Sequence, residues 1–209
     1  MGRPRRHDRD ELLGHARALW LSGGISSVTI RALSAASGAS NGAVYHAFGS
    51  RDGLLARVWA SEAEGFLQLQ REQVAQALAD GDPVAAFVAA AVAPATHAES
   101  DADGARVLLA ADLDDFLTSD LNDGARELLH GLRVDLGRLL IQLAEALWNR
   151  RDRAAVTAIR YGVVNLPGAL LLNGDDVADP VAMHVLEQAA RGIAAEPPPE
   201  SHRKDRPAV

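Results

Sequence analysis

One short segment of the chain groups side chains that suit contact with another polar molecule. They are Asn41, Gly42, Tyr45 and His46. In a helix they face largely away from Val44 and Phe48, which lie four residues apart on one apolar side. An amide can read an adenine edge, and a glycine permits close backbone approach. A helix of roughly eight residues has little stability alone, so neighbouring elements must hold it.

Helix caps and a glycine define those neighbours. Thr29 is placed to cap a first short helix, Gly38 can take the φ > 0 conformation that ends it, and Ser40 can cap the second. Two short helices joined by a tight turn predict a helix-turn-helix, whose second helix enters the DNA major groove. Ser50 then caps a long helix predicted over residues 51–79.

The same segment resembles the DNA-binding domain of the tetracycline-repressor (TetR) family of bacterial transcription regulators. The matching positions are Thr29, Leu33, Ser37-Gly38-Ala39-Ser40, Gly42, Tyr45-His46-Ala47-Phe48 and Ser50-Arg51-Asp52-Gly53-Leu54. Three positions depart from the family pattern. Ala39 replaces a larger aliphatic residue, Ala47 stands where a phosphate-contacting His is common, and Arg51 replaces Lys with the same charge.

The resemblance implies an all-α fold with double-stranded DNA as a partner. A three-helix helix-turn-helix domain is expected at 8–57 and a helical ligand-binding and dimerisation domain at 58–195. Residues 196–209 are proline-rich and predicted to be disordered. The expected DNA-binding residues are Thr29, Arg31, Ser40, Asn41, Gly42, Tyr45, His46 and Arg51.

Within that set we assign two kinds of contact. Asn41, Gly42 and Tyr45 are expected at base edges. The expected phosphate contacts are Thr29, Arg31, His46 and Arg51.

Charge is distributed in agreement with a DNA-binding N-terminus. The formal net charge is −7. Residues 1–57 contain eight Arg and four acids, a balance of +4, whereas residues 58–209 contain 13 bases and 24 acids, a balance of −11. A basic module is attracted to phosphates, and an acidic remainder confines that attraction to one end of the chain.

The rest of the chain is predicted to be helical, beginning after the stop signal Asp80-Gly81-Asp82-Pro83. Helices are expected at about 83–98, 105–111, 119–149, 152–172 and 179–191, with a loop at 97–104. Pro94 should bend or end the first of these, Pro167 should kink the fourth, and Gly192 should close the last.

The last two predicted helices suggest a homodimer. Segments 152–172 and 179–191 are apolar on more than one face, which is too much to bury within a small monomer. The resemblance implies that these helices form a four-helix dimer interface, in which Val163 and Val185 would lie. It also implies that the region 83–172 binds an unknown small-molecule effector, and that repression is the common outcome.

Other chemistry is disfavoured. The absence of cysteine excludes disulfides and thiolate sites. The seven histidines show no zinc-site spacing, and the acidic segment 97–103 indicates a solvated loop rather than a metal site. No P-loop, nucleophile elbow or dinucleotide fingerprint occurs. We therefore expect no enzyme, no metal and no cofactor.

A cytoplasmic protein is expected. No apolar run approaches the roughly 20 residues of a membrane span, and no apolar segment follows the basic N-terminus. Two alternatives stay open: a helical ligand-binding or scaffold protein that has lost DNA binding, and a helical enzyme, which no residue supports.

Overall fold

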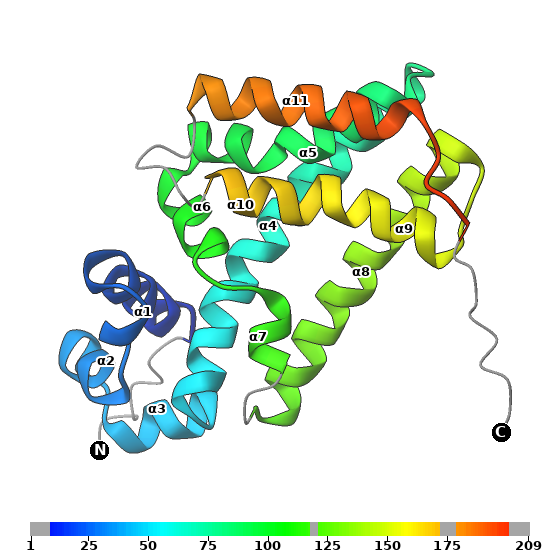
Figure 1. Ribbon diagram of the computed structural model, residues 1–209. Coiled ribbons are helices and arrows are strands. Elements are labelled where there is room, and N and C mark those ends of the chain that lie inside the picture. Colours follow the sequence, from blue (N-terminus) through cyan, green and yellow to red (C-terminus); the bar gives the residue numbers. More distant parts are fainter. Residues whose placement is uncertain (1–8, 118–120, 172–178, 201–209) are drawn as a thin grey trace, which may run out of the picture. The chain divides into compact units, whose positions relative to one another are not determined.

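The computed structural model describes residues 9–117, 121–171 and 179–200, and this part of the chain contains helices and no strand (Figure 1). The helices are α1 (Arg9–Gly23), η1 (Ile25–Ser27), α2 (Ile30–Ser37), α3 (Asn41–Phe48), α4 (Arg51–Ala79), α5 (Pro83–Ser100), α6 (Ala102–Leu109), α7 (Leu113–Leu117), α8 (Asp123–Trp148), α9 (Arg153–Arg160), η2 (Tyr161–Asn165), α10 (Leu166–Leu171) and α11 (Pro180–Ala195). The all-α prediction is confirmed.

Two compact units make up the chain. The first contains Met1–Leu67 and His97–Asp135, and the second contains Gln68–Thr96 and Leu136–Val209. The boundaries expected at 57 and 195 stay a prediction. Of the expected tail, residues 196–200 are described, and the carbonyl of Pro198 accepts a hydrogen bond from Arg150. Residues 201–209 lie outside the described chain.

The helix-turn-helix forms through the caps expected from the sequence. The Thr29 hydroxyl oxygen accepts a hydrogen bond from the N–H of Ala32, and the Ser40 hydroxyl oxygen accepts one from Ala43. Gly38 has φ 73°, a left-handed conformation in which a side chain would be strained. Thr29 thus begins α2, Gly38 ends it, and Ser40 begins α3 after a turn of three residues. This short turn fixes the direction of α3 after α2.

A continuous apolar core supports these helices in the first unit. Its fully buried side chains include Leu33, Val44, Phe48 and Leu54. Trp59 of α4 adds a polar anchor, since its indole N–H donates to the carbonyls of Leu108 and Ala111 at 3.0 Å each. These two hydrogen bonds connect α4 to the end of α6.

Pro94 was expected to bend or end its helix. It lies inside α5, so the expected end is wrong, and the bend stays a prediction. A proline lacks the N–H that would bond to the carbonyl four residues earlier, here that of Ala90. In the second unit, the Gln70 amide donates to that carbonyl at 2.8 Å, and Gln70 is only 1% exposed. A side chain 20 residues away thus satisfies the carbonyl that Pro94 leaves free.

The prediction of a loop at 97–104 is also wrong. Helix α5 continues to Ser100, and α6 begins two residues later at Ala102 rather than at 105. The turn is compact because Asp101 caps α6 directly, with its carboxylate accepting from the N–H of Gly104 at 2.9 Å.

Two further boundaries need correction. Helix α8 begins at Asp123 rather than 119, because Asn122 caps it through the N–H of Ala125 at 2.9 Å. Residues 118–120 lie outside the described chain. At the other end of the protein, Gly192 does not close α11, which continues to Ala195. The capping of α11 by Asp179 before Pro180 is confirmed.

A π turn, η2, lies just before Pro167, where a kink was expected, and the kink itself stays a prediction. In η2 the N–H of Leu166 bonds to the carbonyl of Tyr161, five residues back. A Cβ added to Gly162 would lie 2.4 Å from the Phe87 ring, so only glycine permits this close approach to α5. Residues 172–178 lie outside the described chain.

One helical segment of the described residues is apolar enough to cross a membrane by length and composition alone. It is Arg153–Leu171, which the search for long apolar runs in the sequence did not find. A single such segment is weak evidence for a membrane span, because a core helix of a soluble protein passes the same test.

Candidate nucleic-acid interface

Helix α3 divides into a buried side and an exposed side. Val44 and Phe48 have no exposed surface and face the core of the first unit. The four side-chain positions singled out from the sequence are all exposed; they are Asn41, Gly42, Tyr45 and His46. Tyr45 is 53% exposed although its ring is large. The structure thus brings these four residues together on the surface of one short helix.

The orientation of Asn41 is set by a neighbour that sequence reasoning missed. The Ser34 hydroxyl on α2 donates to Asn41 Oδ1 at 2.6 Å. A carbonyl oxygen has a second lone pair, so Oδ1 can accept another hydrogen bond while the amide nitrogen donates. This combination of donor and acceptor is what an adenine edge requires. The seven-residue separation between the two side chains gave no signal before the turn geometry was known.

The capping residues also lie at the surface. Thr29 and Ser40 are exposed, and each uses its hydroxyl oxygen as a helix cap. A capping hydroxyl keeps its own hydrogen, which can donate to a phosphate oxygen. Arg31 is exposed in the first turn of α2, close in sequence to the Thr29 cap. These three positions are available for phosphate contacts.

Arg51 is used differently from what its charge alone suggested. Its guanidinium donates to the carbonyl of Val28 at 2.7 Å and to that of Ile25 at 2.6 Å. It therefore holds the turn around η1 that leads into α2. Its side chain is 39% exposed. A phosphate contact by Arg51 stays a prediction, and its visible role is to position the start of α2.

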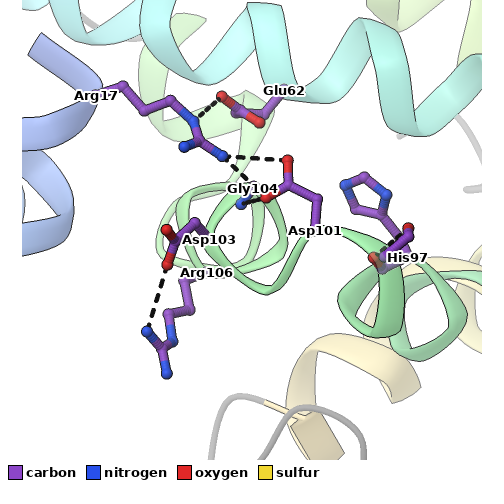
Figure 2. Close-up of polar contacts among 8 residues, drawn as sticks. Arg17, Glu62, His97, Asp101, Asp103, Gly104 and Arg106 are labelled. Atoms are coloured by element: carbon purple, nitrogen blue, oxygen red, sulfur yellow. Dashed lines mark hydrogen bonds and ion pairs between the residues drawn. The ribbon is translucent and has the colours of Figure 1, made fainter. Parts of the chain in front are cut away.

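An ion-pair cluster in the first unit joins α1, α4 and the start of α6 (Figure 2). Arg17 donates through Nε to Glu62 at 2.7 Å and through Nη2 to both oxygens of Asp101 at 3.1 Å. Figure 2 shows the Arg17 guanidinium directed at these two carboxylates. Sequence reasoning missed this cluster, because its members are 45 and 84 residues apart from Arg17.

The cluster shifts the protonation of two of its members. The pKa of Asp101 is lowered, first by the hydrogen bond from the Gly104 N–H and then by the charge of Arg17. The pKa of Arg17 is raised, first by its hydrogen bond to Glu62. Asp101 and Arg17 are therefore both charged at neutral pH, and their attraction helps to link α1 to the start of α6.

Among the described residues, no three metal-ligating side chains gather. Asp101 caps α6 and pairs with Arg17, while Asp103 lies 3.5 Å from Arg106 (Figure 2). The charges of these two carboxylates are thus compensated by arginines.

Comparison with known proteins identifies this helix-turn-helix. Residues 12–58 match the family described as bacterial regulatory proteins, tetR family. No curated protein matches the chain.

Several solved structures share the fold. A TetR family transcriptional regulator, PfmR, from Thermus thermophilus is 19% identical, with a TM-score of 0.60 over 89% of this chain and 98% of that one. The superantigen PfiT is 17% identical, with a TM-score of 0.62 over 90% and 96%. The ketosteroid transcriptional regulator KstR2 of Mycobacterium tuberculosis is 15% identical, with a TM-score of 0.56 over 92% and 95%. At these identities the likeness shows the fold alone.

Proposed function

We propose that this chain, whose residues 12–58 match the tetR family of bacterial regulatory proteins, represses transcription by binding a near-palindromic DNA operator as a homodimer. In this proposal a small molecule controls DNA binding. The protein acts in the cytoplasm, where the DNA is. Its family is one of regulators, and we assign it no catalytic role.

The observation that carries this proposal is the exposed side of α3. An eight-residue helix is held by two fully buried side chains, Val44 and Phe48, while its polar and aromatic residues face solvent. A helix fixed in this manner can enter the major groove without having to fold on contact. The match over residues 12–58 covers the same helix.

We assign the contacts by chemistry. Asn41, held by Ser34, reads an adenine, and Gly42 and Tyr45 contact neighbouring base edges. We assign phosphate contacts to residues at the starts of α2 and α3, at the end of α3 and at the start of α4. These residues are Thr29, Arg31, Ser40, His46 and Arg51.

The second unit supports the proposed dimer through apolar side chains left at its surface. Val181, Val185 and Tyr161 are 68%, 43% and 57% exposed. They lie on η2 and α11, which contact each other. Val163, the other valine chosen from the sequence, is 3% exposed and belongs to the core. A substitution at Val185 therefore tests the interface, whereas one at Val163 tests folding.

The effector acts in this proposal by shifting a population. A small molecule bound in the region 83–172 favours dimers whose two recognition helices are wrongly spaced for one turn of DNA, roughly 34 Å. Such a ligand must bind the two states with different affinity, because equal affinity shifts nothing.

Selection from random-sequence DNA, followed by gel shift, tests the proposal. We expect enrichment of a sequence with two related half-sites. A chain that folds as described but retains no DNA at low salt would instead support the alternative of a helical ligand-binding or scaffold protein that has lost DNA binding.

A further inference from the structure

Arg57 on α4 carries a charge for which the described residues of the first unit provide no ion-pair partner. Its Nε atom is buried and has no hydrogen-bond partner. Among the described residues, no carboxylate forms an ion pair with its guanidinium. A buried guanidinium nitrogen without a partner costs free energy, and buried cations are normally paired. The lack of an ion-pair partner for this cation therefore favours an anionic ligand.

A second arginine lies in the same neighbourhood. Arg9, at the start of α1, donates to the carbonyl of Ala47 at 2.9 Å, and its guanidinium carbon lies 5.6 Å from the centre of the Phe48 ring. The charge of Arg9 lowers the pKa of Arg57, after burial as the first cause. The exposed Arg9 has free donors left after its bond to Ala47.

The start of α8, whose first turn also carries the acidic residue Asp123, lies at the same place. Asn122, which caps α8, also donates through Nδ2 to the carbonyl of Phe48 at 2.9 Å, next to the Arg9 ring contact. A Cβ at Gly124 would lie 2.9 Å from Arg57 Nη2, so a glycine in the first turn of α8 makes room for the guanidinium. A cation at this end of a helix opposes the helix dipole.

We propose that Arg57 and Arg9 bind a phosphate-type oxyanion between α1, α4 and the first turn of α8. Two planar guanidinium groups can hold the oxygens of one tetrahedral anion through paired N–H donors. The anion would contact the guanidinium groups outside the buried Nε atom of Arg57 and would offset the repulsion between the two arginines. The source of the phosphate group is either a free phosphate-bearing small molecule or the DNA backbone.

Thermal unfolding with inorganic phosphate tests the free-ligand source without any DNA. Phosphate is compared with chloride at equal ionic strength, for the parent protein and for Arg57→Gln. We expect phosphate to raise the unfolding temperature of the parent and its affinity to fall at least tenfold in Arg57→Gln. Arg106→Gln is the matched control, because Arg106 is in the same unit, exposed and paired with Asp103.

The repulsion argument supplies a second readout. In chloride at low ionic strength, Arg57→Gln should unfold at a temperature equal to or above that of the parent, since it removes an uncompensated cation. If Arg57→Gln fails to fold, the proposed lack of compensation is wrong. Arg9→Gln then carries the phosphate test, with the same expected loss of affinity.

The DNA source rests on the proposed function and is tested separately. If phosphate gives no stabilisation, Arg57→Gln should still reduce the slope of log affinity against log salt by about one on the selected operator. Arg106→Gln should leave that slope unchanged. If no variant binds DNA at all, the proposed function fails, and the phosphate measurement alone decides this site.

Two results would overturn the site. One is a phosphate effect that persists in both Arg57→Gln and Arg9→Gln, which indicates an adventitious ion only. The other is the absence of both a phosphate effect on the parent and a changed salt slope in Arg57→Gln.

Discussion

The two compact units share one kind of support but present different surfaces. In both, side chains reach across the sequence to polar partners: Arg17 pairs with Asp101 in the first. In the second, Gln70 donates to the Ala90 carbonyl and Arg150 to that of Pro198. The exposed side of α3 is polar, whereas α11 exposes valines.

This difference indicates two kinds of partner. A short polar helix anchored by hydrogen bonds suits a charged, hydrated surface such as DNA, where the reading residues must be held in place before contact. Exposed valines gain nothing from such a surface and are stabilised by burial against other apolar groups. We therefore expect changes in the second unit to act on assembly, and changes in the first to act on recognition.

The largest effect is expected at the apolar surface. Val185→Asp would bury an unpaired charge in the proposed interface, at a cost of several kcal/mol to dimerisation. Light scattering should show a monomer, and operator binding should be lost. Val134→Asp is the matched control, because Val134 is 52% exposed but belongs to the first unit. A dimeric Val185→Asp protein would show that α11 is not at the interface.

The next effect concerns base reading. Asn41→Ala removes the amide that Ser34 orients, so preference at one position in each half-site should relax by about 1–3 kcal/mol. Comparing sequences selected by parent and variant measures this change. Ser34→Ala should weaken the same preference by a smaller amount, because the amide is kept and only its orientation is freed. Identical selected sites in all three proteins would remove Asn41 from the reading surface.

The next prediction concerns the free energy of unfolding and tests the buried hydrogen bond of Gln70 in the second unit. Gln70→Met keeps the approximate volume but leaves the Ala90 carbonyl unsatisfied in the core, which should cost about 1–3 kcal/mol in urea unfolding. Gln76→Met on the same helix is the control, since Gln76 is exposed and bonds only to Asp80. Equal stabilities for the two variants would mean that Gln70 does not sustain α5 past Pro94.

The smallest effect is a pH dependence in the first unit. Asn caps a helix about as well as Asp, so Asp101→Asn removes the charge and keeps the cap. Because folding lowers the pKa of Asp101, its contribution is present above the ordinary value of 3.8 and is lost as the pH falls through the folded pKa. The difference in the free energy of unfolding, measured in urea, should be constant above about pH 5, amount to less than about 1 kcal/mol, and vanish in strong acid. A difference that grows in acid would contradict the assignment.

Local signals predicted the helix-turn-helix better than the bounds of the later helices, for a physical reason. Thr29, Gly38 and Ser40 act on backbone groups within four residues, so their effect can be read from the sequence. Pro94 acts on a carbonyl that Gln70 satisfies from another helix, and no local pattern connects the two. Single-residue rules failed where a tertiary contact compensated for them.

The residues of the candidate site divide in the same way, into those set by a local pattern and those set by tertiary contacts. The exposed residues of α3 were found from their spacing, since helical periodicity alone sets their side. Ser34 and the Arg17 cluster were missed, because their partners are brought close only by the turn or by packing between helices. The bonds from Arg51 to Ile25 and Val28 were missed for the same reason.

The central claim is that two chains bind one operator, and the composition of the complex tests it most directly. Light scattering of the protein mixed with a duplex selected from random DNA gives the number of chains per duplex. We expect two chains on a near-palindromic duplex, and much weaker binding to a duplex that keeps a single half-site. One chain bound per duplex, with undiminished affinity for the single half-site, would contradict the account.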